Sequence, residues 1–548
     1  MASRTDYSSW EKEDLIKKIK ALEKRKKYGL VWDSAREPEK VVLDCQKELP
    51  VLKEIKDKEI HSSKNGVTHI LIEGDNYHAL SALNYTHEKS VDLIYIDPPY
   101  NTGNDDFIYN DRYIDTEDPY RHTKWLSFMD KRLRLAKPLL KKSGVIFISI
   151  DDNELAHLKL LCDDIFGEAN LIGLVTVAKG TTTGQDAKHF GSSADYLLVY
   201  AMPNFALGKI ELSENDKRRF TRKDDKGNYS ILQWRKTGNG DRREDRPNLY
   251  YPIAGPDGKP VYPIGPTGYE SRWRGDLKRL KQFDKQKMVE WIQMDDGWRP
   301  YIKYYLEGRG KAPSNLWTDL EGNKKATIEL KEFFGERVFT NPKPTDLIKR
   351  CISLSNAIDP LVLDFFAGSG TTAQAVLNFN SQDDGNRRFI LCTNNENNIC
   401  SDVCYPRIQK LIKGYRNSKG EDTEASGGNL KYYTTSFVPA APTDKNKELL
   451  TKQSTEMLTL KEGTFERVTA NPSYIIYRNS DKYTGIIFDQ LSFAEFKKAV
   501  SKVNKPISLY IFSLADEDFS DDFADMRGLV KICAIPESIL RVYRRIFR

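Results

Sequence analysis

Short, almost wholly apolar runs alternate with helical stretches in two separate parts of the chain. VDLIYI (91–96) and SGVIFISI (143–150) flank an amphipathic stretch at 125–140, while LVLD (361–364) and RRFILCT (387–393) come much later. Runs of this length and apolarity are typical of strands that are buried on both faces of a parallel sheet. Their alternation with helices predicts a doubly wound α/β fold.

The chain is too long for a single hydrophobic core. Its 548 residues suggest three or four folding units, at about 150 residues each. Between about 205 and 335 the periodic pattern gives way to arginine, lysine, tyrosine, tryptophan, glycine and proline. The N-terminal part predicts one charged helix from Lys12 to about Lys27 and a second helix over 38–59. We therefore expect a helical N-terminal extension at 1–60, a first core half at 61–204, an inserted domain at 205–335, a second core half at 336–429 and a small α/β domain at 430–548.

Bulk properties exclude several classes of protein. No stretch approaches the roughly 18 consecutive apolar residues of a membrane span, and the N-terminus lacks the apolar run of a secretory signal, so we expect a cytoplasmic protein with no membrane partner.

Seven dispersed cysteines indicate reduced thiols. Cys400 and Cys404 are not spaced as a zinc pair and all histidines lie at or before His189, so we expect no metal site. The net charge of +6 permits a polyanionic partner without requiring one.

The run at 91–96 leads directly into Asp97-Pro98-Pro99-Tyr100. The two prolines prevent helix continuation and remove two backbone donors. Asp97 would then lie beyond the carboxyl end of a parallel strand, which is where open α/β sheets bind their ligands. An ordinary Asp-Pro turn would also explain the motif, so its context has to decide.

A second strand ends in LVLDFFAGSGTT, where Asp364 is followed by Gly368 and Gly370 and a helix begins near Thr371. A strand, a glycine turn and a helix in this order bring backbone amides to a polar or anionic ligand. The loop lacks the lysine of a P-loop, which disfavours triphosphate binding. The next strand ends near Glu396, an acid that suits hydrogen bonds to ribose hydroxyls. A glycine cap and a solvated glutamate are the structural alternative.

Together the two motifs resemble the signature pair of amino-group methyltransferases that use S-adenosylmethionine, with DPPY as the target motif and Asp364, Phe366, Gly368 and Gly370 as the cofactor motif. The target motif precedes the insert and the cofactor motif follows it, an order that resembles the beta class of DNA adenine (N6) methyltransferases. DPPYNTG, EKRKKYGLVW upstream and NPKPTDLI before the cofactor motif look like the modification (Mod) subunit of type III restriction-modification systems. The resemblance covers roughly residues 20–410 and, more loosely, the C-terminal domain.

The resemblance implies that an adenine amine is methylated after its nucleotide is flipped out of double-stranded DNA. Asp97 and the backbone carbonyl of Pro98 would each accept one amine hydrogen, and proline rigidity, with Pro99 next in the chain, would hold that carbonyl in place. Tyr100 would stack on the base. The residues that the resemblance assigns to cofactor binding are Asp75, Lys343, Asp364, Phe366, Gly368, Gly370, Thr371 and Glu396.

Several of these assignments have ordinary structural alternatives. Asp75 matches a loop at the adenine ring of the cofactor, but a helix N-cap explains it equally well. Lys343 matches a segment at the methionine end of the cofactor. Asn101 and the next two residues finish the target loop, and simple turn chemistry explains them too. His189 and Phe190 match a loop that borders the flipped base.

The insert is the candidate target-recognition domain, because its arginines and aromatic residues are the types that reach phosphates and guanine edges. A solvated charged surface is the alternative for each single arginine. The candidates are Arg242, Arg243, Arg272, Arg274, Arg299, Trp234, Tyr269, Trp273 and Trp298.

The resemblance therefore implies a site-specific DNA adenine methyltransferase that acts as a homodimer. No helicase-like P-loop or nuclease motif is evident, so cleavage would need a separate restriction (helicase-nuclease) subunit. Three alternatives stay open. A stand-alone type II enzyme would lack a neighbouring helicase-nuclease gene, and a methyltransferase for cytosine-N4 or RNA would label a different base. A non-catalytic DNA-binding regulator would transfer no methyl group.

Overall fold

The computed structural model describes residues 11–13, 15–16, 39–62, 66–103, 106–110, 112–115, 117–179, 191–320, 322–515 and 517–547. The chain divides into two compact units, one formed by Met1–Gly208 with Ser314–Arg548 and the other by Lys209–Pro313. The second unit is narrower than the insert predicted at 205–335, because residues from Ser314 onward belong to the first unit. Among the described residues of the whole chain, no helix is both long enough and apolar enough to cross a bilayer.

The first unit is built on a sheet that has ten strands among the described residues. Six neighbouring strands at its centre, from β22 to β6, run parallel, and β8 and β1 pair antiparallel with the strands at the two ends of this group. The central strands are almost wholly buried, which confirms the predicted α/β core. In order across the sheet the strands are β1 (Glu48–Glu54), β22 (Asn429–Pro439), β2 (Thr68–Glu73), β19 (Arg388–Thr393), β18 (Leu361–Asp364), β3 (Val91–Ile96), β6 (Leu140–Ile150), β8 (Ala194–Ala201), β7 (Leu171–Ala178) and β17 (Leu316–Trp317).

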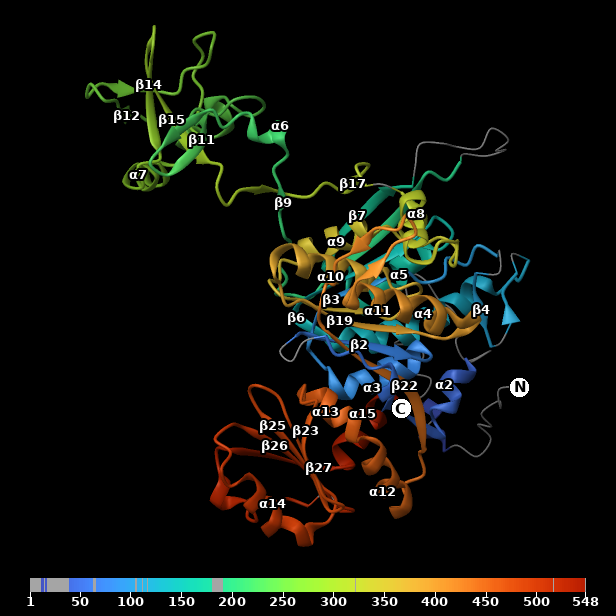
Figure 1. Cartoon of the computed structure of the whole chain (residues 1–548). Coiled ribbons are helices and arrows are strands. Elements are labelled where there is room, and N and C mark those ends of the chain that lie inside the picture. The colour runs from blue at the N-terminus through green and yellow to red at the C-terminus, as the bar shows by residue number, and fades with distance from the viewer. Residues whose placement is uncertain are drawn as a thin grey trace. The chain divides into compact units, whose positions relative to one another are not determined.

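The direction of the chain across the sheet reverses between β18 and β3. Helix α4 (Arg121–Ala136) connects β3 to β6 on one side, whereas α10 (Thr371–Asp383) connects β18 to β19 on the other (Figure 1). Because such connections are right-handed, α4 and α10 cover opposite faces of the sheet. The carboxyl ends of β18 and β3 therefore border a crevice, which is the usual ligand site of an open α/β sheet.

The remaining helices before the C-terminal part surround this sheet. Helix α3 packs against α4, α4 packs against α5, and α10 packs against both α9 and α11. Two short hairpins, β4–β5 and β20–β21, lie outside the main sheet. The bounds are α2 (Lys40–Asp44), α3 (Asn76–Thr86), α5 (Leu155–Phe166), α8 (Asn323–Phe334), α9 (Thr345–Leu354), α11 (Tyr405–Lys413), β4 (Ile108–Tyr109), β5 (Arg112–Tyr113), β20 (Tyr415–Arg416) and β21 (Asp422–Thr423).

The helix predicted over 38–59 is wrong beyond Asp44. Residues 48–54 form β1 instead, which pairs along its length with β22. Leu49, Val51 and Leu52 are buried, and Pro50 between them cannot donate the hydrogen bond that a helix interior needs. The helix predicted from Lys12 to Lys27 lies mostly outside the described residues.

The described residues of the C-terminal part form a second sheet of five strands in chain order, parallel from β25 to β27 and antiparallel before it. Its elements are not independent of the main sheet: β22 belongs to that sheet, and α13 and α15 contact α3. A domain boundary at 430 would therefore separate a central strand from its neighbours. The bounds are α12 (Asp444–Gln453), α13 (Thr455–Glu462), β23 (Glu466–Ala470), β24 (Tyr474–Arg478), β25 (Tyr483–Ile487), α14 (Phe493–Val500), β26 (Ile507–Phe512), β27 (Val530–Ile535) and α15 (Glu537–Ile546).

The second unit has its own sheet in the order β10-β11-β15-β14, with α7 packed against β14 (Figure 1). Its core is small and consists of Trp234, Ile253, Trp273, Leu280 and Ile302. The bounds are β9 (Ile210–Glu211), α6 (Glu214–Lys217), β10 (Arg222–Asp224), β11 (Gly227–Gln233), β12 (Ile253–Ala254), β13 (Pro260–Val261), α7 (Leu277–Lys285), β14 (Val289–Met294), β15 (Gly297–Tyr305) and β16 (Gly310–Lys311).

Tyr543 tests whether the C-terminal helix stabilises the main sheet. Its ring is 1% exposed and its hydroxyl donates to the carbonyl of Pro50 in β1. We expect Tyr543→Ala to lower the free energy of unfolding by about 3–5 kcal/mol through loss of the buried ring, and Tyr543→Phe by about 1 kcal/mol through loss of the hydrogen bond. Urea unfolding measures both changes. Equal stability of the alanine variant and the wild type would show that α15 does not support the sheet.

Candidate active site

The sheet brings the predicted site residues together at one edge. β18 and β3 are hydrogen-bonded neighbours in register, with Val362 opposite Leu93, so the residues that follow the two strands lie side by side. A cavity of about 980 Å³ opens at this edge. The predicted residues that line it are Asp75, Asp97, Pro99, Lys343, Asp364, Phe366, Gly368, Thr371 and Glu396.

Lys343 holds the carboxylate of the target motif. Its Nζ lies 3.4 Å from Oδ1 of Asp97 and donates to the hydroxyl of Tyr100 at 2.6 Å and to Oδ2 of Asp195 at 3.1 Å. Tyr100 in turn donates its hydroxyl hydrogen to Oδ1 of Asp97 at 2.9 Å. The structure thus places Lys343 with the target motif, while its predicted contact with the cofactor stays a prediction.

The ionisation of this cluster depends on the buried ammonium. Burial raises the pKa of Asp97 above its ordinary value, and Lys343 and the hydroxyl of Tyr100 oppose that rise. Burial lowers the pKa of Lys343, but the carboxylates of Asp97 and Asp195 outweigh burial and leave it raised. The side chain of Lys343 is 9% exposed, so its charge is poorly hydrated and needs both acids. Lys343 and Tyr100 thus oppose the effect of burial on Asp97, whose side chain lines the cavity.

The backbone of the target motif is also fixed from the helix side. Trp125 is buried in α4, and its indole Nε1 donates to the carbonyl of Pro99 at 2.7 Å. Pro98 is buried beside it. Nζ of Lys343 lies 4.7 Å from the centre of the Tyr100 ring, so the lysine covers part of the ring that was predicted to stack on a base. The burial of Trp125 could have been predicted from its place in an amphipathic helix. Its hydrogen bond to Pro99 could not.

The glycine turn after β18 requires glycine at both predicted positions. Gly368 and Gly370 have positive φ angles of 48° and 81°, which disfavour other residues. A side chain at Gly370 would also meet Sγ of Cys404 at 3.1 Å. The chain enters α10 directly after this turn, and Thr371, the first residue of the helix, lines the cavity.

A buried arginine that the sequence did not indicate clamps this turn. Arg407 of α11 is 1% exposed and donates to the carbonyl of Ser369 at 3.1 Å and to the hydroxyl of Thr371 at 3.2 Å. Its Nε donates to Gln374 at 3.0 Å. Burial lowers the pKa of Arg407 to about 10, so the guanidinium stays charged at neutral pH and fixes the turn.

Asp364, at the end of β18, connects the glycine turn to the start of α10 through hydrogen bonds. It accepts from the hydroxyl of Thr372 at 2.6 Å and from the amide of Phe366 at 3.0 Å. The side chain is 3% exposed, and burial raises its pKa to about 7. These contacts hold the turn closed, so Asp364 shapes the cavity wall as well as lining it.

The opposite wall is built on a second buried arginine that was not predicted. Arg132 of α4 forms two hydrogen bonds with Glu39, at 2.7 and 2.9 Å, and lies 3.4 Å from Asp75. Its guanidinium stacks 3.6 Å from the centre of the Phe128 ring, and that ring is 5.9 Å from the ring of Phe366. This wall therefore combines a buried ion pair with two neighbouring aromatic rings.

Of the other predicted site residues, two line the cavity and two lie outside the described part of the chain. Asp75 is the N-cap of α3 and accepts from the amide of Tyr77 at 2.7 Å, while it also lines the cavity. Both interpretations of Asp75 are thus compatible with its position. Glu396 is exposed just after β19, at the cavity rim. His189 and Phe190 lie outside the described residues.

The predicted recognition residues of the second unit fall into two groups. Trp234 and Trp273 are 3% and 1% exposed and form that unit's core, so these two indoles do not form a contact surface. Arg243 and Arg299 are partly exposed, and each pairs with a nearby acid. The exposed arginines stay candidates for phosphate contacts.

Comparisons with known proteins agree with this geometry. A family model described as DNA methylase (N6_N4_Mtase) matches residues 91–402. The type II methyltransferase M.KpnI of Klebsiella pneumoniae is 37% identical over 338 residues, which are 59% of this chain and 79% of that protein. The type III restriction-modification enzyme EcoPI Mod subunit of Escherichia phage P1 is 34% identical over 373 residues, or 60% of this chain. The match spans only 57% of the length of that Mod subunit.

A structure of TTHA0409, a DNA modification methylase from Thermus thermophilus complexed with S-adenosyl-L-methionine, is 14% identical. The alignment covers 66% of this chain and 99% of that chain, with a TM-score of 0.32. This similarity is too low to support an inference about function.

Asp364→Asn tests the buried carboxyl. Because burial raises its pKa to about 7, from an ordinary value of 3.8, the folded chain keeps a proton that the unfolded chain releases between these pH values. This carboxyl therefore makes the wild type less stable as pH rises, and asparagine removes the effect. We expect the stability of Asp364→Asn relative to the wild type to increase by roughly 2–3 kcal/mol between about pH 5 and pH 8. Urea unfolding at several pH values measures the difference, and a constant difference would contradict the prediction.

Proposed function

The chain belongs to the DNA methylase family, whose model it matches over residues 91–402, and we propose that it is a site-specific DNA adenine-N6 methyltransferase that uses S-adenosylmethionine. One observation carries the proposal: Asp97 and the glycine turn from Phe366 to Thr371 line a single cavity from two neighbouring strands. A group held at the turn and a base held at Asp97 would therefore meet inside one cavity, which is what a direct group transfer requires.

The cavity fits S-adenosylmethionine by size and by chemistry. Its volume of about 980 Å³ lies at the upper end of the usual range for small-molecule sites, which leaves room for the cofactor and part of a base. The aromatic ring of Phe366, the amides at the start of α10 and the acids Asp75 and Glu396 would hold the aromatic, carboxylate and hydroxyl groups of the molecule. When bound, S-adenosylmethionine supplies a methyl group that its sulfonium has already activated.

The chain's own residues would prepare the adenine amine. The amine is a poor nucleophile because its lone pair is delocalised into the ring. Asp97 would accept one amine hydrogen and the carbonyl of Pro98 the other, which draws the nitrogen toward tetrahedral geometry. Lys343 favours the ionised form of the acid and Tyr100 fixes its orientation, so the acceptor is organised before the base arrives.

The type III Mod identity is part of the proposal and rests on the motifs and on the similarity to the EcoPI Mod subunit. By that resemblance, the substrate is double-stranded DNA, the second unit reads its sequence, and the enzyme acts as a cytoplasmic homodimer with a separate restriction subunit. The assignment of the target half to 61–204 and of the cofactor half to 336–429 also stays part of this proposal.

A stand-alone type II methyltransferase is the second candidate. The similarity to M.KpnI favours it, because the matched region covers 79% of that protein, whereas it covers 57% of the EcoPI Mod subunit. The two candidates share the same reaction. Co-purification of a helicase-nuclease subunit with the chain, and DNA cleavage by the mixture, would favour the type III assembly.

The reaction itself is tested with S-adenosylmethionine that carries a labelled methyl group. After incubation of the full chain with DNA and digestion to nucleosides, we expect the label in N6-methyldeoxyadenosine. Label in N4-methyldeoxycytidine would overturn the assignment of the base. An unlabelled digest would favour a DNA-binding protein without activity.

Asp97→Ala should abolish methyl transfer and leave the cofactor site intact. Loss of the carboxylate removes an acceptor that acts on the amine, so we expect kcat to fall by about a thousandfold or more. The dissociation constant for S-adenosylmethionine, measured by calorimetry, should stay within about twofold. Asp383→Ala, an exposed acid on α10, is the matched control. Loss of cofactor binding in Asp97→Ala would contradict the division of the site into two halves.

Phe366→Ala should have the opposite effect. If the ring stacks on the cofactor, its removal would weaken S-adenosylmethionine by roughly ten- to a hundredfold, as expected for about 1–3 kcal/mol of stacking. DNA binding, measured by fluorescence anisotropy, should be unchanged. Phe437→Ala, a partly exposed ring in β22, controls for the loss of an aromatic residue. Unchanged cofactor affinity in Phe366→Ala would show that the ring does not contact the cofactor.

A further inference from the structure

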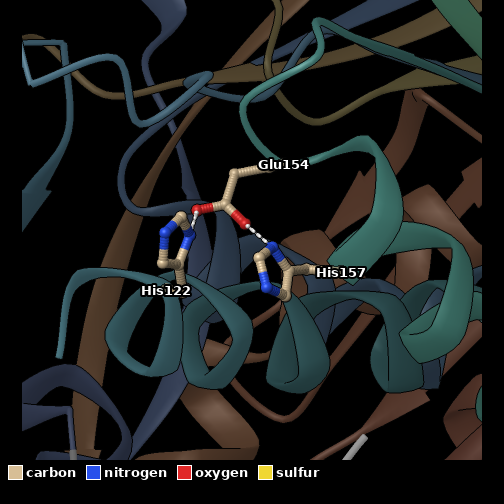
Figure 2. Close-up of side chains that lie close together, drawn as sticks. All are labelled: His122, Glu154 and His157. Carbon is tan, nitrogen blue, oxygen red and sulfur yellow. Dashed lines mark hydrogen bonds and ion pairs between the residues drawn. The ribbon is translucent and has the colours of Figure 1, made fainter.

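A buried hydrogen-bonded cluster lies directly behind the target motif. Glu154, the residue before α5, is 0% exposed, and its Oε1 accepts from Nδ2 of Asn101 at 2.6 Å and lies 2.6 Å from Nδ1 of His122. Its Oε2 lies 2.9 Å from Nδ1 of His157. Figure 2 shows both imidazoles directed at this one carboxylate. Three side chains, one from the target loop and one each from α4 and α5, thus meet at Glu154.

The contact between Arg121 and His122 determines which nitrogen of His122 carries the hydrogen. Arg121 donates its Nε hydrogen to Nε2 of His122 at 3.2 Å, so a neutral His122 carries its hydrogen on Nδ1. That hydrogen is therefore directed to Glu154, which must accept it together with the hydrogen from Asn101. A carboxylate accepts several hydrogen bonds at once, whereas a carboxylic acid must donate its own hydrogen. Oε1 of Glu154 therefore accepts two hydrogen bonds. Burial raises the pKa of Glu154 to about 7, and the contacts with Asn101 and His157 oppose that rise.

The same side chains could in principle bind a metal ion, because their ligand atoms lie within 4.8 Å of one another. Three features disfavour that use. The hydrogen on Nδ1 of His122 occupies the position that a metal would need, and the guanidinium of Arg121 adds a positive charge beside it. The separation of 2.6 Å between Nδ1 of His122 and the carboxylate is also shorter than the roughly 3.3 Å that separates two ligands of a tetrahedral zinc ion.

Asn101 connects the cluster to the target motif. It follows Tyr100 directly, it is 0% exposed, and its φ angle of 57° is left-handed. Asparagine tolerates this conformation better than most residues, but it still needs support from the surroundings. The hydrogen bond to Glu154 provides that support. The target motif is therefore held on both sides of Tyr100, by Trp125 at Pro99 and by Glu154 at Asn101.

We propose that Glu154 is a positioning residue for the target motif: its carboxylate, oriented by His122 and His157, anchors Asn101 and thereby fixes the backbone that presents Asp97 and Tyr100. Its role in methyl transfer rests on the proposed function, whereas its role in anchoring the loop does not. Glu154 is 0% exposed and is not among the residues that line the cavity of about 980 Å³, so its route to the target motif is the contact with Asn101.

The test combines two single variants and their double variant. Asn101→Gly removes the anchoring side chain but retains a residue that adopts positive φ freely, and Glu154→Gln removes the charge at nearly constant volume. Glu88→Gln, a partly exposed acid that pairs with Arg545, is the matched control. Thermal unfolding of each full-length variant checks that the fold is retained, and Asn101→Gly keeps the test possible if Glu154→Gln fails to fold.

Two measurements separate the anchor from the reaction. Hydrogen exchange of the peptide that covers residues 97–103 should be about tenfold faster in each single variant than in the wild type. In the double variant it should be no faster than in the single variants. The kcat for methyl transfer should fall roughly tenfold in each, again without a further loss in the double variant, while cofactor affinity stays within about twofold. The control should match the wild type in both measurements.

Three results would overturn the proposal. They are unchanged exchange of the loop in the single variants, losses that multiply to about a hundredfold in the double variant, and stoichiometric binding of Zn²⁺ that His157→Gln abolishes. If the wild type transfers no methyl group to DNA, the proposed function fails, but the exchange measurement still decides whether Glu154 anchors the loop.

Discussion

The pairing of β18 with β3 is the contact on which the candidate site depends. These two strands are neighbours in the sheet although about 270 residues separate them in the sequence, and the chain departs from them in opposite directions. Their carboxyl ends therefore form one edge, with the target motif after one strand and the glycine turn after the other. A one-residue shift of either strand would turn its side chains to the other face of the sheet and misplace the motif that follows it.

The cations at this edge are buried and hydrogen-bonded to protein groups. Lys343 lies between Asp97 and Asp195, Arg132 pairs with Glu39, and Arg407 clamps the glycine turn. Each is an almost fully buried cation with hydrogen-bonded partners, and removal of one partner would leave an unpaired buried charge. Such networks hold side chains rigidly, which suits a site that must present an acceptor to a base at fixed geometry.

The sequence allowed the sheet and both motifs to be predicted, because continuous apolar runs and glycine or proline turns are local signals. The long-range side-chain contacts could not be predicted. Arg132 is one of several basic residues in α4, and nothing local distinguishes the buried one. Glu154 and His157 are three positions apart, but their convergence with His122 and Asn101 depends on how α4 and α5 pack. The helix predicted over 38–59 is a different case, because Pro50 was a local signal against it.

The central claim is that the chain methylates adenine at a defined DNA sequence, with the cofactor and the base bound in one cavity. Sequencing that detects modified bases in a host carrying the gene tests this claim most directly, with a host that carries Asp97→Ala as the reference. The account predicts N6-methyladenine at a single short sequence in the first host and unmodified adenine at the same sequence in the second. Identical modification patterns in the two hosts, or modification of another base, would contradict it.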